Sequence, residues 1–159
     1  LLLSQGSRQH PYEQWTRDLL SRGSTGRAIE HDPSAGTTRV LASGLEYCYG
    51  LCSDGARVVA SESWRHRVVA IDGARREAVV NALPSYPGRI SPAEGGGYWV
   101  SSFAARTQLV EFVLREDDYR IDMMRTVEPR YWVAPALSSG ADFLEPLQIG
   151  SVTLIDARE

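Results

Sequence analysis

The residues of this chain that could carry chemistry are few, and they are not grouped in a known catalytic pattern. Its three histidines are His10, His31 and His66. None of them lies near a serine or an aspartate in a nucleophile arrangement, and no two have the spacing of metal ligands. We therefore expect surface or inter-strand roles for all three.

The two cysteines, Cys48 and Cys52, stand four residues apart in the sequence CYGLC. On a strand, this spacing puts their Cα atoms roughly 13 Å apart, which is too far for a disulfide. A zinc site would need further cysteine or histidine residues nearby. The sequence predicts that both cysteines are small buried strand residues.

Glu62 is the carboxylate with the most suggestive surroundings, because Arg65 and Arg67 follow it closely. It could contact a substrate and act as a general acid or base. The alternative is a structural ion pair that ties its strand to the next repeat unit. We keep Glu62 as a candidate substrate-binding residue and favour the ion pair.

These residues belong to a chain of 159 residues, which is long enough for one domain with a hydrophobic core. The net charge of −3 gives no electrostatic reason to expect nucleic acid or an anionic membrane as a partner. No apolar run approaches the roughly 20 residues of a membrane span. Leu1 to Leu3 lack the features of a signal peptide, and we expect that the true N-terminus is missing.

The elements that must position these residues are mostly short strands separated by Gly, Asp and Pro turns, which is typical of an antiparallel meander. A helix is predicted at 12–22, where apolar residues recur at helical spacing, and helices are predicted within 103–149. Pro84 and Pro87 are expected to end the strand before them. The predicted strands are 1–4, 26–32, 38–42, 48–53, 58–63, 67–71, 78–83, 89–91 and 98–102.

Internal repeats set the architecture. Residues 26–32 align with 66–72, forty positions later, and again with 150–156. A second repeat relates 1–4, 58–61 and 99–102. A period near forty with four short strands per unit is the signature of a β-propeller blade. We expect three strands of one blade, one complete blade, and two or three strands of another.

Several short motifs, taken in order, resemble one known family. They are Gly26-Arg27 to Asp32-Pro33, Gly44-Leu45, Tyr49-Gly50-Leu51, Ser61-Glu62-Ser63-Trp64-Arg65, Leu83-Pro84-Ser85-Tyr86-Pro87, Gly96-Gly97-Tyr98-Trp99-Val100 and, in the helical insert, Glu128-Pro129-Arg130-Tyr131-Trp132. In this order and spacing they are similar to the strictosidine synthase-like six-bladed β-propellers, and the last motif to bacterial members. That group is related to the gluconolactonase, senescence-marker and paraoxonase families.

The resemblance implies an all-β fold: a fragment of a six-bladed propeller, about two to three blades, in one partial domain over 1–159. Helical inserts are expected at about 11–23 and 103–149, over one face of the ring. The innermost strands, here 49–53 and 88–91, would line a central tunnel. The rest of the ring, or a second copy of the chain, would cover the free sheet edges.

Hydrolytic members of these families hold Ca²⁺ or another divalent ion at the tunnel mouth through Asn and Asp side chains. This sequence departs from that pattern. Tyr49 stands where the family carries Asn before Gly50, and Gly88-Arg89 replaces Asp-Asn. Since arginine cannot ligate a metal and repels one, we expect no metal or other cofactor here.

Tyr49 and Arg89 are therefore the best substrate-binding candidates, and Arg89 could clamp a carboxylate or phosphate. The alternative is that the two side chains fill the former metal cavity. The sequence favours a propeller acting on small organic molecules, as a lactonase or arylesterase-type hydrolase or as a relative that has lost its metal. A C–N bond-forming enzyme like strictosidine synthase and a non-catalytic ligand-binding propeller are the alternatives.

Overall fold

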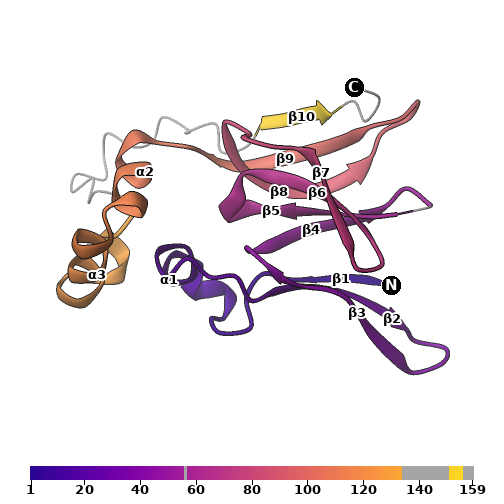
Figure 1. The fold of residues 1–159 in the computed structure, drawn as a ribbon, viewed down its shortest axis with the longest axis horizontal. Coiled ribbons are helices and arrows are strands. Elements are labelled where there is room, and N and C mark those ends of the chain that lie inside the picture. The colour runs from indigo at the N-terminus through magenta and orange to yellow at the C-terminus, as the bar shows by residue number, and fades with distance from the viewer. Residues whose placement is uncertain (56, 134–150, 156–159) are drawn as a thin grey trace, which may run out of the picture.

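The computed structural model describes residues 1–55 and 57–133 and the backbone of the strand at 151–155. Figure 1 shows short strands in layered sheets, with the helices gathered at one end. The strands are β1 (Leu2–Gln5), β2 (Gly26–Asp32), β3 (Thr37–Leu45), β4 (Cys48–Ser53), β5 (Val58–Glu62), β6 (Arg67–Asp72), β7 (Arg75–Val80), β8 (Ser85–Pro92), β9 (Tyr98–Ala105) and β10 (Ser151–Ile155).

The described strands form three antiparallel sheets in the orders β1-β2-β3, β4-β5-β6-β7 and β10-β9-β8. The first contains three strands of one blade, the second is a complete four-stranded blade, and the third contains three strands of the next blade. The inner strands of the second and third blades, β4 and β8, lie against each other, and β1 packs against β4. The predicted propeller fragment is thus confirmed at the level of blades and strand order.

Several strand boundaries differ from the prediction, and those of β7 and β8 have identifiable causes. β8 runs through Pro87, although prolines were expected to keep the strand from starting before Arg89. The register of β8 against β9 shifts on both sides of Pro87, and such a bulge tolerates a residue without an N–H donor. β7 ends at Val80 rather than at Leu83, because Ala82 has φ 54° and turns the chain toward β8.

The helices occupy equivalent positions in successive blades. α1 (Trp15–Leu20), with a 3₁₀ turn at Tyr12–Gln14 before it, lies in the connection from β1 to β2. α2 (Gln108–Arg115) and α3 (Asp117–Thr126) lie in the connection that follows β9. In the complete blade the same connection is only a 3₁₀ turn at Ser63–Arg65. The helices therefore gather at one end of the sheets, where they form a helical layer (Figure 1).

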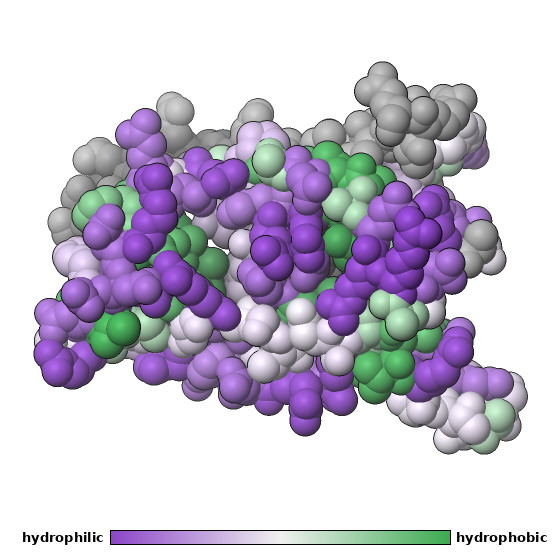
Figure 2. Space-filling view, viewed as in Figure 1, coloured by the Kyte–Doolittle hydropathy of each residue, from purple (hydrophilic) through white to green (hydrophobic). Residues whose placement is uncertain are grey.

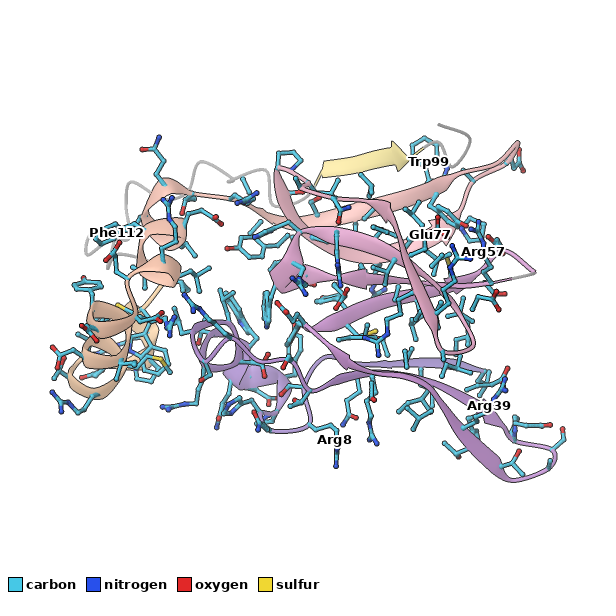
Figure 3. The ribbon with its side chains drawn as sticks, in the orientation of Figure 1. Arg8, Arg39, Arg57, Glu77, Trp99 and Phe112 are labelled. Atoms are coloured by element: carbon cyan, nitrogen blue, oxygen red, sulfur yellow. The ribbon has the colours of Figure 1, made fainter. Side chains whose placement is uncertain are left out.

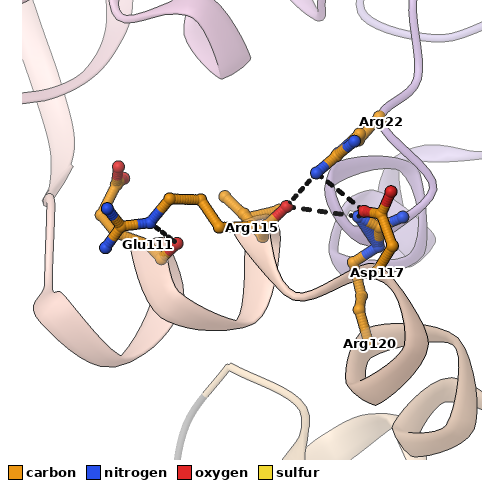
Figure 4. A network of polar contacts seen from close by, with 6 residues as sticks. Arg22, Glu111, Arg115, Asp117 and Arg120 are labelled. Carbon is orange, nitrogen blue, oxygen red and sulfur yellow. Dashed lines mark hydrogen bonds and ion pairs between the residues drawn. The ribbon is translucent and has the colours of Figure 1, made fainter.

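Polar contacts join the two parts of this helical layer. The Arg22 guanidinium lies 2.9 Å from the Asp117 carboxylate and donates to the Leu114 carbonyl. Arg120 donates to the same carboxylate at 3.0 Å and to the same carbonyl at 3.3 Å (Figure 4). The end of α1 is thus tied to the junction of α2 and α3. None of the helices in the described residues is long and apolar enough to span a membrane.

Apolar cores fill the spaces between adjacent blades. One core packs Val59 and Val68 of the complete blade against Val100 of the next, and a second packs Ala28 and Leu45 against Val69. Cys48 and Cys52 are free and buried, as predicted. Figure 2 shows hydrophilic side chains over most of the visible face. Arg39 and Arg57 lie at the end of the sheets away from Phe112 of α2 (Figure 3).

Candidate functional site

A close approach of two inner strands creates the candidate site. A Cβ atom on Gly50 of β4 would lie 2.5 Å from the carbonyl oxygen of Gly88 on β8, so glycine is required there. The buried Ser61 hydroxyl bridges the gap: it accepts from the Gly50 N–H at 2.9 Å and donates to the Gly88 carbonyl at 2.6 Å. Ser63 adds a bond of 2.7 Å to the Pro87 carbonyl. These contacts hold β4 and β8 side by side at Gly50 and Gly88.

Tyr49 and Arg89 consequently line one hollow of about 310 Å³, together with Ser4, Tyr12 and Tyr47. We call it the polar hollow. The Ser4 hydroxyl donates to the Tyr49 carbonyl at 2.7 Å, and the Ser101 hydroxyl accepts from the Arg89 N–H at 2.9 Å, so both backbones are anchored. The structure thus brings together two of the residues that the sequence singled out.

A second hollow of about 220 Å³ adjoins the first and shares Tyr12, Tyr47 and Tyr49 with it. We call it the aromatic hollow, because its lining consists of Tyr12, Trp15, Tyr47, Tyr49, Trp64 and Phe103. The Tyr49 ring stacks on Phe103 with ring centroids 5.6 Å apart and planes 22° apart. The Tyr47 ring lies 4.2 Å from Trp64, centroid to centroid. The lining is thus a set of interlocked rings rather than flexible side chains.

Asp18 of α1 fixes the central ring of this wall. Its buried carboxylate accepts from the Trp64 indole N–H at 2.8 Å. Gly23 leaves room for the carboxylate, since a Cβ there would lie 2.3 Å from Asp18 Oδ1. The bond crosses from the helical layer to the complete blade, so the orientation of Trp64 depends on the docking of α1.

The phenols of Tyr47 and Tyr49 are neutral at physiological pH. Burial is the main cause that raises the pKa of Tyr47 to about 12. Burial, and then the neighbouring Tyr12, also raise the pKa of Tyr49 above its ordinary value, although Arg89 opposes the shift. Both hydroxyl groups therefore remain protonated and can donate hydrogen bonds.

Arg89 supplies the cationic group of the polar hollow. Its side chain is exposed, and within the described residues its guanidinium has no ion pair or side-chain hydrogen bond. A guanidinium next to a neutral phenol offers several donors and one positive charge at a single spot. This arrangement is suited to binding the carboxylate or phosphate of a small molecule.

Glu62 lies elsewhere. Its side chain is 1% exposed; Oε1 accepts from the Glu46 N–H at 3.0 Å, and Oε2 accepts from Arg67 Nε at 2.6 Å. Arg67 is its register partner on β6, so the ion pair joins strands of one blade rather than two blades. Both oxygens of Glu62 are thus bound, one within the blade and one to the connection before β4, and Glu62 lines neither hollow. The ion pair that the sequence favoured is present, but it does not tie β5 to the next blade as expected.

The residues at the expected metal position do not fit a divalent cation. Hard cations take oxygen ligands, preferably carboxylates. Here the side chains are a neutral phenol and a guanidinium, and the carbonyl oxygens of Tyr49 and Gly88 already accept serine hydroxyl groups. In the described part of the chain, no three His, Cys, Asp or Glu residues gather to hold a metal ion.

Sequence reasoning missed Tyr12, Tyr47, Phe103 and Asp18. Three of them are supplied by irregular connections and by a helical insert that interrupts the repeat, so no strand motif pointed to them. A signal was present for Tyr47: a Cβ on Gly6 would lie 2.9 Å from its ring, so a glycine after β1 marks the place where the ring packs.

The sequence also gave no indication that His66 contacts α2. His66 is buried, and its Nε2 lies 3.6 Å from Glu111 Oε1 of α2.

Comparison with known proteins agrees with this architecture. The family model described as strictosidine synthase matches residues 1–71. Strictosidine synthase-like protein 6 of Arabidopsis thaliana is 27% identical over 149 residues, which cover 91% of this chain and 40% of that protein. Strictosidine synthase-like protein 13 of the same plant is 31% identical over 99 residues, covering 58% of this chain and 25% of that protein.

The adipocyte plasma membrane-associated protein of Bos taurus is 28% identical over 149 residues, covering 81% of this chain and 36% of that protein. The chain thus spans two fifths or less of the length of these curated relatives. On its motifs, its blades and these matches, the chain is similar to the strictosidine synthase-like β-propeller proteins.

Proposed function

We propose that this chain is part of a six-bladed propeller that binds a small organic molecule with an anionic group, without a metal at these blades. The rest of the ring covers the free edges of the sheets. The observation that carries the proposal is the convergence of Tyr49 and Arg89 in the polar hollow, directly beside the aromatic hollow. A cation, a neutral phenol and a wall of rings together suit an aromatic carboxylate.

A carboxylate bound by a guanidinium and a phenol O–H makes charge-assisted hydrogen bonds, which contribute about 1.5–3 kcal/mol each. An aromatic ring stacked between Tyr49 and Trp64 adds apolar burial. The pre-packed rings lose little conformational freedom on binding, which limits the entropic cost.

Calorimetric titration with benzoate tests this proposal. Arg89→Met keeps the aliphatic stem and removes the charge, and we expect it to weaken binding by about 10- to 100-fold. Tyr49→Phe removes one hydrogen bond and should have a smaller effect of several-fold. Arg75→Met is the matched control, since Arg75 is exposed on β7, far from both hollows. Equal affinity in Arg89→Met and the wild type would refute the proposal.

A hydrolase of the lactonase or arylesterase class is the second candidate, and it rests on the family resemblance. It would require a metal held by residues other than those at Tyr49 and Arg89. Hydrolysis of phenyl acetate, measured with and without added Ca²⁺, distinguishes the candidates: calcium-dependent turnover would favour the hydrolase. The C–N bond-forming alternative depends on a carboxylate outside this chain, and the same propeller would then use the two hollows only to hold substrate.

A further inference from the structure

A third space lies beside the aromatic hollow, between the helical layer and the third blade. It is a cavity of about 130 Å³, and its lining consists of Trp15, Leu19, Trp64, Tyr86, Phe103, Ala104, Ala105, Thr107, Val110 and Val133. We call it the apolar cavity. Most of its lining is apolar, Tyr86 and Thr107 supply its side-chain hydroxyl groups, and Val110 of α2 contributes part of the wall.

The apolar cavity adjoins the aromatic hollow, because Trp15, Trp64 and Phe103 line both spaces. The centroids of these three rings lie 6.2–6.3 Å from one another, so the rings form the partition between the two spaces. Trp64 is fixed by its hydrogen bond to Asp18. Trp15 and Phe103 are only half-buried, so they are less enclosed than Trp64.

The three spaces therefore form a series of decreasing polarity. The polar hollow carries the Arg89 cation, the aromatic hollow carries rings with phenol hydroxyls, and the last space is apolar. An engineered apolar cavity of about 150 Å³ stays dry and accepts benzene. A cavity of 130 Å³ is close to that size, so it is suited to an alkyl end or a small ring.

We propose that the ligand is an amphiphilic acid, whose anionic group binds at Arg89 and whose apolar end enters the apolar cavity beneath α2. This inference rests on the proposed function and specifies the ligand class for the same site. The apolar end displaces no bound polar partner, and its burial contributes about 0.8 kcal/mol per CH₂ group. Affinity should therefore rise steeply with the length of the apolar part.

Calorimetry with benzoate, 3-phenylpropanoate and 6-phenylhexanoate tests the inference on the wild-type protein. We expect the Kd to fall at least tenfold from benzoate to 6-phenylhexanoate. Val110→Trp fills the apolar cavity from α2 and should abolish this gain while leaving benzoate affinity unchanged. Ala105→Phe fills the same cavity from β9 and serves as the second variant if Val110→Trp does not fold. Thermal melting shows whether each variant is folded.

The two proposals fail in different ways. If benzoate binding does not depend on Arg89, the proposed function itself is overturned. If benzoate binds through Arg89 but the three acids have equal affinity, only the amphiphilic ligand is excluded. A gain with length that survives in both filled variants would place the apolar end outside the apolar cavity and would also overturn the inference.

Discussion

Ser61→Ala is the substitution that most sharply tests how the site is held together. The serine hydroxyl is fully buried and joins two blades, since it accepts from Gly50 N–H and donates to the Gly88 carbonyl. Alanine keeps the size and the strand conformation but removes both bonds. The Gly50 N–H lies where the register of β4 against β5 shifts, so no backbone hydrogen bond between these strands can replace the bond to the serine.

The expected cost follows from the two orphaned groups. An unsatisfied buried donor or acceptor costs about 1–3 kcal/mol, and the carbonyl loses less because it has a second lone pair. We therefore expect a loss of about 2–4 kcal/mol in the free energy of unfolding. Water cannot easily replace the hydroxyl, because even a Cβ on Gly50 would lie only 2.5 Å from the Gly88 oxygen.

Urea-induced unfolding followed by tryptophan fluorescence measures this loss. Ser43→Ala is the matched control, since Ser43 is exposed on β3, and its effect should stay within about 0.5 kcal/mol. Benzoate affinity should fall in Ser61→Ala as well, because the strands that carry Tyr49 and Arg89 are no longer bridged. A loss below about 1 kcal/mol with unchanged affinity would refute the role of Ser61 in holding the site.

Three further predictions concern other contacts. Burial lowers the pKa of His66 below its ordinary value of 6.5, so the contribution of the neutral imidazole to stability is complete above that pH and is lost as the pH falls. In His66→Asn, the free energy of unfolding measured in urea should therefore decline less between pH 7 and pH 5 than in the wild type. An equally steep decline in that variant would show that other groups are responsible. Gly50→Ala should lower both the melting temperature and benzoate affinity, and an unchanged protein would contradict the close approach to Gly88. Arg67→Met leaves the Glu62 carboxylate buried without its cation and should cost about 3–5 kcal/mol, with part of the loss recovered in the double variant Glu62→Gln/Arg67→Met.

Much of the fold could be predicted because a propeller repeats its strands along the chain. The spacing of forty residues between 26–32 and 66–72 identified equivalent strands, and the glycine and aspartate turns marked their ends. Prediction failed where tertiary contacts override local preference. Pro87 should interrupt a strand, yet a bulge in the register against β9 accommodates it within β8.

The site was predictable only at its strand positions. Tyr49 and Arg89 could be identified because each replaces a residue of a recognisable motif at the start of an inner strand. Their aromatic surroundings could not, since Trp15 and Phe103 are brought to the same place by an insert helix and by the far end of β9. Sequence periodicity describes blades, whereas this wall arises from the way the helical layer packs on the ends of the blades.

Under the proposed function, Tyr49 and Arg89 bind the anionic group of a small molecule and not a metal. A crystal structure of the protein grown with benzoate and Ca²⁺ together distinguishes these two possibilities. We predict the benzoate carboxylate within hydrogen-bond distance of the Arg89 guanidinium and the Tyr49 hydroxyl, with its ring in the aromatic hollow. A calcium ion bound between these two residues, or benzoate bound only elsewhere, would contradict the claim.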